Sequence, residues 1–233
     1  MNVLAIDVGG THVKILVTGE SVKREFESGP DLNPEIMVAG VKKLTEDWKY
    51  DVVTIGFPGP VVHDRPVREP YNLAKGWVGF DFQAAFGCPV RVINDAAMQA
   101  LGSYNGGRML FLGLGTGLGS TMIAEGVVQP MELAHLPYRK GTYEDYVGLR
   151  GLKKFGKKKW RRHVENVVQL LKAALVADEV VLGGGNARLL KELPAGCRLG
   201  DNANAFAGAF RLWKNEEKMS QPVAATKQTG DSV

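Results

Sequence analysis

Residues 3–18 read VLAIDVGGTHVKILVT, which is an apolar strand, a double-glycine turn and a second apolar strand. The stretch 109–125, MLFLGLGTGLGSTMIAE, has the same order, and a shift of 108 residues lays Leu4–Gly9 over Leu112–Gly117. Short apolar runs bounded by glycine are typical of buried strands joined by tight turns. The repeat therefore predicts an α/β protein of two related lobes, each with a glycine turn at a shared cleft.

Periodicity and turn residues predict the remaining elements. Further strands are expected at 22–27, 52–56, 90–93, 127–129 and 179–182. Helices are expected at 33–48, at 96–104, along the apolar stripe from Trp160 to Leu175, from Gly183–Asn186 onward and at 204–213. We predict a first lobe at 1–105, completed by a C-terminal helix at about 202–213, a second lobe at 106–201, and a disordered polar tail at 214–233.

Composition limits the class of protein. The chain has 233 residues, of which 45% are apolar and 23% charged, close to an ordinary globular protein. It contains no run of about 18 apolar residues and no basic N-terminal region, so we expect neither a transmembrane helix nor a signal peptide. Two cysteines, Cys88 and Cys197, are too few for a disulfide framework or a cysteine-rich zinc site. The expected location is a reducing cytoplasm.

The basic residues are concentrated in one segment. Residues 150–162, RGLKKFGKKKWRR, hold eight basic residues and no acid, and taking these eight charges from the net +4 leaves −4. Such a run is typical either of a solvated lysine-rich helix face or of a polyanion contact. No helix-turn-helix, zinc-finger or RNP pattern accompanies it, so nucleic acid is not the expected partner.

Four glycine-rich turns follow predicted strands. Glycine lets a ligand approach the backbone closely, and successive N–H groups in such turns form anion-binding sites. Four turns together favour phosphate binding over plain hairpins. The sequence has no G-x-x-x-x-G-K-[ST] motif, and the turn at 113–120 leads into a strand rather than a helix, which argues against P-loop and dinucleotide-binding folds. The turns are Gly9–Thr11, Gly56–Gly59, Gly113–Ser120 and Gly183–Gly185.

With these residues in view, the chain resembles sugar kinases of the ROK family (repressor, ORF, kinase), and most of all their polyphosphate glucokinase branch. The resemblance implies an actin-like, hexokinase-like (ribonuclease H-like) ATPase fold with two lobes and a central cleft. Position 134 is Ala where the family usually has Gly, and the family's cysteine-rich zinc motif is absent, so no zinc is implied. The matching segments are Asp7–Thr11, Gly56–Gly59, Asn72–Trp77, Asn94–Ala96, Leu114–Ser120, Glu132–His135, Leu182–Gly185 and Leu199–Ala203.

For the acceptor side, the resemblance points to a catalytic carboxylate and a set of sugar-binding groups. Asp95 is the candidate general base for the sugar's primary hydroxyl. The alternative for Asp95 is an N-cap of the helix starting at Ala96. Carboxylates, amides and imidazoles satisfy adjacent sugar hydroxyls in pairs. The candidate sugar-binding residues are Asn94, Glu132, His135, Glu144, Gly59 and Asn72.

For the donor side, the resemblance implies phosphate-binding turns and Mg²⁺. Asp7 would hold Mg²⁺ through water, since this ion gives up its hydration shell reluctantly. The alternative for Asp7 is a strand-end turn residue. Lys14 would either assist at the phosphates or face solvent. The other candidate phosphate- or nucleotide-binding residues are Gly9, Gly10, Thr11, Gly115, Thr116, Gly117, Gly183, Gly184 and Gly185.

The expected function is transfer of a phosphoryl group from polyphosphate, ATP or both to the 6-hydroxyl of glucose. A polyphosphate chain would need a basic track, for which Lys157, Lys158, Arg161 and Arg162 are the candidates. Three alternatives stay open: an ATP-dependent kinase for glucose or another hexose such as fructose, mannose or an N-acetylated amino sugar; a non-catalytic sugar-binding regulator; and an actin-like structural ATPase. Family members are commonly dimers, so a homodimer is expected.

Overall fold

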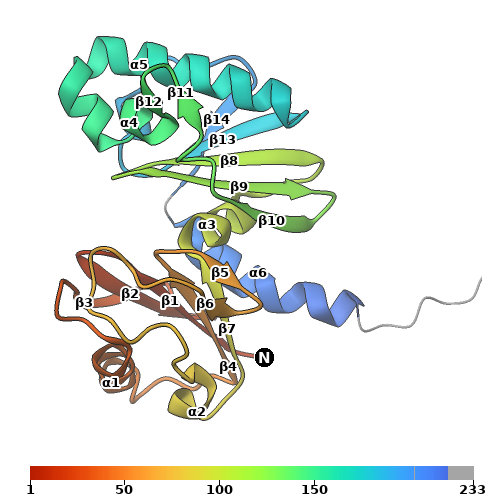
Figure 1. Cartoon of the computed structure of the whole chain (residues 1–233). Helices are drawn as coiled ribbons and strands as arrows, with labels where there is room; N and C mark the ends of the chain where they lie inside the picture. Colours follow the sequence, from red (N-terminus) through yellow and green to blue (C-terminus); the bar gives the residue numbers. More distant parts are fainter. Residues whose placement is uncertain (202, 220–233) are drawn as a thin grey trace, which may run out of the picture.

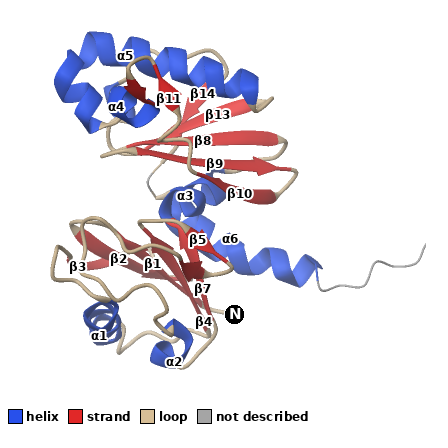
Figure 2. Cartoon of the chain, viewed as in Figure 1, coloured by secondary structure: helices blue, strands red, loops and turns tan. Residues whose placement is uncertain are grey.

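The computed structural model describes residues 1–201 and 203–219. Two five-stranded sheets lie one above the other, and two helices lie between them (Figure 1). Figure 2 shows that the remaining helices cover the outer faces of the sheets, away from this central pair. The region where the two sheets approach each other is therefore built around the two central helices.

The N-terminal sheet has the strand order β3-β2-β1-β4-β7. Its first three strands form an antiparallel meander, while β4 and β7 add in parallel to β1. Helix α1 (Pro34–Leu44) begins at Asn33, whose side chain accepts the Ile36 N–H at 2.8 Å, and α2 (Phe82–Phe86) lies nearby. The strands are β1 (Val3–Val8), β2 (His12–Val17), β3 (Arg24–Glu27), β4 (Val52–Phe57) and β7 (Val90–Asn94), and a small hairpin is formed by β5 (Val61–Val62) and β6 (Arg65–Pro66).

The C-terminal sheet has the order β10-β9-β8-β13-β14, which repeats the topology of the first sheet. The long helix α5 (Leu149–Ala174) covers it with an apolar stripe and bends at Gly156, where φ is 69°. The stripe is made of Trp160, Val164, Val167, Val168 and Leu171. The other elements are β8 (Arg108–Leu114), β9 (Leu118–Ala124), β10 (Val127–Met131), β11 (Pro137–Tyr138), β12 (Gly141–Thr142), α4 (Tyr143–Val147), β13 (Glu179–Gly183) and β14 (Cys197–Leu199).

Helix α3 (Asp95–Ser103) joins the two halves. One side of it packs with α6 (Asn204–Met219) and β1, through residues such as Met98 and Phe206. Its other side packs on β8, β9 and β13 of the C-terminal sheet, through residues such as Leu101 and Phe111. The backbones of α3 and α6 approach closely at Gly102 and Gly208, where an added Cβ would collide with backbone oxygen of the facing helix. Because α3 belongs to both cores, its first residue is held between the sheets.

The repeated strand order confirms the predicted α/β architecture with two related halves. The helix expected from Gly183–Asn186 onward is wrong, because only the three-residue 3₁₀ helix η1 (Ala187–Leu189) forms there. Helix α6 continues to Met219, past the predicted end at 213; the rest of the predicted tail, 220–233, lies outside the described residues. The lobe boundary at 105/106 stays a prediction. Among the described helices, none combines the length and the hydropathy that a membrane span needs.

Candidate active site

The site is organised around the start of α3. Asn94, and not Asp95, caps this helix: its Oδ1 accepts the N–H groups of Ala96 at 3.0 Å and Ala97 at 3.2 Å. Asn94 Nδ2 also donates to the carbonyl oxygen of Gly59 at 3.0 Å, which ties the turn after β4 to the helix. Asp95 is the first helical residue, and its Oδ1 accepts the Ala96 N–H at 2.7 Å. The capping role considered for Asp95 therefore belongs to its neighbour.

Asp95 lies in an acidic, desolvated setting. Burial, followed by the charge of Asp7, raises the pKa of Asp95 to about 7, and the charge of Glu132 acts in the same direction. The hydrogen bond from the Ala96 N–H opposes this shift. A carboxyl group with a pKa near 7 is suited to accept a proton at neutral pH.

Asp7 stands at the end of β1. Burial raises the pKa of Asp7, while Lys14 and Lys23 lower it. Lys14, opposite Asp7 on β2, places its Nζ 3.8 Å from Asp7 Oδ2. The structure thus brings the acidic residue predicted for the donor side close enough to Asp95 to influence its protonation, and pairs it with the predicted lysine.

The first glycine turn is held from both sides. Gly9 donates its N–H to the His12 carbonyl at 3.0 Å, and the Ser28 hydroxyl donates to the Gly9 carbonyl at 2.6 Å. A Cβ added to Gly10 would lie 3.6 Å from the Cβ of Asn72, so the loop carrying Asn72 lies against this turn. Gly10 and Thr11 are exposed and therefore accessible to a ligand.

Three of the four glycine turns carry the candidate phosphate-binding residues: the first is Gly9–Thr11, the second Gly113–Ser120 and the third Gly183–Gly185. The second glycine turn contacts both α3 and the third turn. A Cβ added to Gly119 would lie 2.9 Å from the Cβ of Ala96, next to Asp95. Asn186 donates its N–H to the Leu114 carbonyl and its Nδ2 to the Gly115 carbonyl, both at 2.9 Å. The second and third turns therefore adjoin each other at Leu114 and Gly115, and Gly119, near the end of the second turn, lies beside the start of α3.

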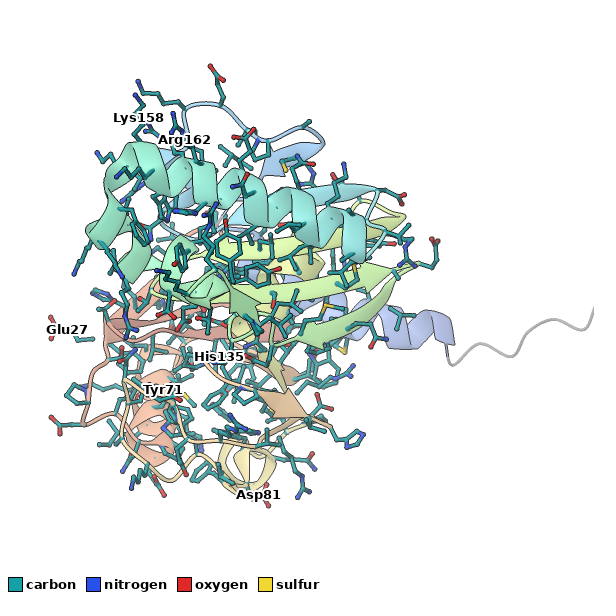
Figure 3. The ribbon with its side chains drawn as sticks, turned by 45° about the horizontal axis from the view of Figure 1, so that its top comes forward. Glu27, Tyr71, Asp81, His135, Lys158 and Arg162 are labelled. Carbon is teal, nitrogen blue, oxygen red and sulfur yellow. The ribbon has the colours of Figure 1, made fainter. Side chains whose placement is uncertain are left out.

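The predicted sugar-binding segment is attached to the same turn. Ser120 donates its hydroxyl to the Met131 carbonyl at 2.8 Å and accepts the Leu133 N–H at 3.2 Å, which orients the segment carrying Glu132. The N–H of Glu144 donates to the Ala134 carbonyl at 3.0 Å. Glu144 Oε2 lies directly against Gly117, where a Cβ would collide with it. Glu132 and His135 are exposed, and Figure 3 shows His135 on the C-terminal half, above Tyr71 of the N-terminal half.

The structure therefore brings together Asp7, Asp95, Glu132 and the three glycine turns, while their individual roles stay predictions. The candidate residues of the basic track lie apart from Asp95, on α5, with Lys158 and Arg162 on the outer surface (Figure 3). A cavity of about 890 Å³ lies elsewhere, between the β5–β6 hairpin and α2, and none of the predicted site residues lines it. This cavity and the candidate site around Asp95 are therefore different places. We assign the active site to the region around Asp95, because the carboxylates converge there.

Three residues that support the site were missed by sequence reasoning: Ser28, Ser120 and Asn186. Ser120 and Asn186 adjoin the glycine-rich runs, so a hydroxyl or amide next to such a run was the available signal. Ser28 lies 19 residues from the carbonyl that it binds, on the far side of β2 and β3, and no local pattern indicates it.

The donor set around Asp7 is a single carboxylate beside a glycine turn, which fits a Mg²⁺ ion bound through water. Among residues 1–201 and 203–219, no group of three or more His, Cys, Asp or Glu side chains is arranged to hold a metal ion. Mg²⁺ usually keeps several waters and is bound by one or two carboxylates together with substrate phosphates. Asp7, a half-buried carboxylate at the end of β1 next to an exposed glycine turn, fits this pattern, and its binding of Mg²⁺ stays a prediction.

Comparisons with known proteins agree with this architecture. Residues 3–130 match the ROK family. Over 207 residues the chain is 28% identical to a polyphosphate glucokinase of Mycobacterium tuberculosis, covering 78% of this chain and 77% of the relative. The fold is similar to that of an inorganic polyphosphate/ATP-glucomannokinase from Arthrobacter sp. strain KM, with a TM-score of 0.78, 22% identity, and coverage of 92% of this chain and 99% of the other. A ROK hexokinase from Thermus thermophilus gives a TM-score of 0.72 at 22% identity, covering 94% and 100%.

Proposed function

Because the chain belongs to the ROK family, we propose that it is a sugar kinase that transfers a phosphoryl group to the 6-hydroxyl of glucose. The observation that carries the proposal is the position of Asp95. Asp95 is the first residue of α3, and the next residue of this helix contacts the second glycine turn. Burial and the charge of Asp7 raise the pKa of the Asp95 carboxyl group to about 7. The relatives named polyphosphate glucokinase support a phosphotransferase with a sugar hydroxyl as acceptor.

In this reaction Asp95 accepts the proton of the 6-hydroxyl as the oxygen attacks the terminal phosphorus of the donor. The bond between that phosphorus and the donor's bridging oxygen breaks, and ADP or a polyphosphate shortened by one unit leaves. One carboxylate oxygen is held by the Ala96 N–H, which leaves the second oxygen for the sugar. The Oδ1 of Asn94 accepts hydrogen bonds in the helix cap, and one of its Nδ2 protons is donated to the Gly59 carbonyl. The other Nδ2 proton is left for the sugar. Glu132, His135, Glu144, Gly59 and Asn72 are the other proposed acceptor contacts.

The glycine turns bind the donor phosphates through their N–H groups and through Thr11 and Thr116. Such preorganised donors stabilise the charge that develops on the transferred group. Mg²⁺, held through water by Asp7, would neutralise phosphate charge when bound. Burial raises the pKa of Asp7, and the ammonium group of Lys14 opposes this shift and so favours the anionic form of that carboxyl.

We propose polyphosphate as a donor, with ATP as an additional or alternative one. Support comes from a chain of contacts that connects the basic helix to the phosphate turn. Arg161 Nε donates to the Leu189 carbonyl at 2.8 Å, and Asn186, at the start of the same short segment, donates to the Gly115 carbonyl. Lys157, Lys158 and Arg162 are exposed on the same helix. Long phosphate chains leaving the turn would thus meet successive cations.

The test is an activity matrix of donors against sugars. Purified protein is assayed with ATP and with polyphosphate, each against glucose, fructose, mannose and N-acetylated amino sugars, at fixed Mg²⁺. Glucose 6-phosphate formed from polyphosphate supports the proposal in full. Product from ATP alone removes the polyphosphate donor, and product from another sugar alone changes the acceptor. Sugar binding by calorimetry without product from either donor would indicate a non-catalytic regulator.

The basic track is tested by replacing Lys157, Lys158 and Arg162 with Gln, leaving Arg161 in place because it also holds the Leu189 loop. We expect a higher KM for polyphosphate and a weaker dependence of that KM on salt, while kcat with ATP stays close to wild type. The matched control replaces three exposed lysines of the N-terminal half, Lys42, Lys43 and Lys49, with Gln. Equal effects of both replacements would remove the track from the proposal. The homodimer and the cytoplasmic location stay predictions.

A further inference from the structure

The carboxylate of Glu144 lies against the second glycine turn. A Cβ added to Gly117 would collide with its Oε2, so this oxygen rests directly on Gly115–Gly117, the segment that we assign to the donor phosphates. Glu144 is half-buried, and in the described part of the chain its carboxylate makes neither a hydrogen bond nor an ion pair. No buried side-chain oxygen in that part of the chain lacks a partner, so the carboxylate still reaches solvent. It is therefore free to interact with a ligand.

Helix α4, which carries Glu144, connects the proposed acceptor segment to the donor turn. At the start of α4, the Glu144 N–H donates to the Ala134 carbonyl at 3.0 Å, within the segment Glu132–His135. Just after its end, the Leu149 N–H donates to the Thr116 carbonyl at 3.1 Å. The backbone of Glu144 is thus held between the two proposed substrate sites, while no hydrogen bond among the described residues holds its side chain.

The charge of Glu144 opposes a donor at this position. Backbone N–H groups in a glycine turn attract phosphate oxygens, whereas a carboxylate beside the same turn repels them. Water screens this repulsion less when the carboxylate is half-buried than when it is fully exposed. Within residues 1–201 and 203–219, no cation pairs with Glu144, so the protein itself does not neutralise this charge. A carboxylate turned away from Gly117, toward the acceptor segment, would relieve the repulsion.

We propose that Glu144 couples the binding of the two substrates. Without sugar, its carboxylate rests on Gly117 and weakens donor binding. Sugar hydroxyls bind the carboxylate and draw it off the turn, so the donor then binds more tightly. This inference rests on the proposed sugar kinase function, in which Glu144 is an acceptor contact, and adds a regulatory role to that contact.

The coupling has two consequences. A donor that binds poorly in the absence of sugar loses less of its phosphoryl group to water, which is a side reaction that kinases must limit. Coupling between two binding sites is also reciprocal, so the donor must tighten sugar binding by the same factor.

The experiment measures donor binding by calorimetry with and without sugar. The donor probes are the non-hydrolysable ATP analogue AMPPNP and inorganic tripolyphosphate, each with Mg²⁺. The sugar is saturating 6-deoxyglucose, which keeps the other hydroxyls of glucose but cannot accept the phosphoryl group. Wild type is compared with Glu144→Gln, which preserves the size of the side chain and removes its charge.

The control variant is Glu125→Gln, because Glu125 is an exposed acid of the same half, at the opposite end of β9 from the second turn. Thermal unfolding of each variant checks the fold. If Glu144→Gln does not fold, Glu144→Asp takes its place, since the shorter side chain withdraws the carboxylate from Gly117.

We expect 6-deoxyglucose to lower the Kd of the probe for the active donor by at least about 5-fold in wild type. Without sugar, Glu144→Gln should bind this probe at least about 3-fold more tightly than wild type, and sugar should change its Kd by less than about 2-fold. Glu125→Gln should match wild type. The comparison without sugar decides even if Glu144→Gln has lost sugar binding.

A wild-type donor Kd that sugar leaves unchanged overturns this inference alone. The same holds for a Glu144→Gln protein that binds the donor probe no more tightly than wild type without sugar, or that keeps the full coupling. A Glu125→Gln protein that behaves like Glu144→Gln also overturns it, because the effect would then come from net charge. A wild-type protein that neither binds nor phosphorylates any sugar overturns the proposed function, and this inference with it.

Discussion

Ala96 of α3 packs against Gly119 of β9 so closely that a Cβ on the glycine would lie 2.9 Å from the alanine Cβ. This contact joins the start of the central helix to the strand that follows the second glycine turn. Since Asp95 precedes Ala96 directly, the contact also sets how near the proposed base comes to the proposed phosphate site. The distance between the proposed base and the donor phosphates thus depends on position 119 being a glycine, which has no side chain.

Gly119→Ala should therefore displace the start of α3. Misplacement of reacting groups by about 1 Å can cost up to about 100-fold in rate, so we expect kcat to fall at least about 10-fold. The Kd of the sugar should change less than kcat, because most sugar contacts are not touched. The control is Gly113→Ala, where an added Cβ meets its nearest atom at 3.4 Å. Equal kcat values for the two variants would contradict this account.

The rate should depend on the protonation of Asp95. With a pKa of about 7, the carboxylate form is lost as the pH falls, so log kcat/KM should decrease with unit slope below about pH 7. Asp95→Asn should lower kcat by about 10²- to 10⁴-fold and flatten this limb, while sugar binding persists. Pre-steady-state and steady-state rates from pH 5 to 9 measure both effects. Near wild-type turnover by the variant would remove Asp95 from the mechanism.

The free energy of unfolding should also depend on the protonation of Asp95. It should fall as the pH rises, whereas the rate should rise. The pKa of Asp95 is raised from 3.8 to about 7, so between these values the folded protein binds more protons than the unfolded chain. The contribution of Asp95 to folding is therefore complete below about pH 4 and is lost as the pH rises through 7. Asp95→Asn should gain at least about 3 °C in Tm relative to wild type between pH 4.5 and pH 8. A constant Tm difference across this range would argue against the raised pKa.

The third glycine turn offers two neighbouring glycines with different requirements. Gly184 has φ of 80°, and a Cβ there would lie 2.6 Å from the Leu114 carbonyl oxygen, whereas nothing lies within 4 Å of a Cβ on Gly185. Gly184→Ala should therefore destabilise the protein by about 1–3 kcal/mol, and Gly185→Ala by less than about 0.5 kcal/mol. Urea unfolding of both variants measures the difference. Equal midpoints would mean that the turn relaxes around the added methyl group.

Much of the fold followed from local pattern. The strands around Asp7 and in 109–114 were predictable, because short apolar runs separated by glycine turns are typical of buried antiparallel strands. The boundary between Asn94 and Asp95 was harder, since both side chains suit an N-cap. The prediction that a helix starts at Gly183–Asn186 is wrong. Gly184 adopts a left-handed conformation to pass Leu114, a contact that lies about 70 residues away in sequence.

The sequence by itself determined which residue types stand at which strand ends, because periodicity and turn chemistry act within a few residues along the chain. It also determined the family, which the match of residues 3–130 to the ROK family shows. Only the tertiary structure decided that the charges of Asp7 and Glu132 act on Asp95, and that Asn94 ties the Gly59 turn to the start of α3. These relationships arise from packing between segments about 35 to 90 residues apart, and local pattern contains no measure of such distances.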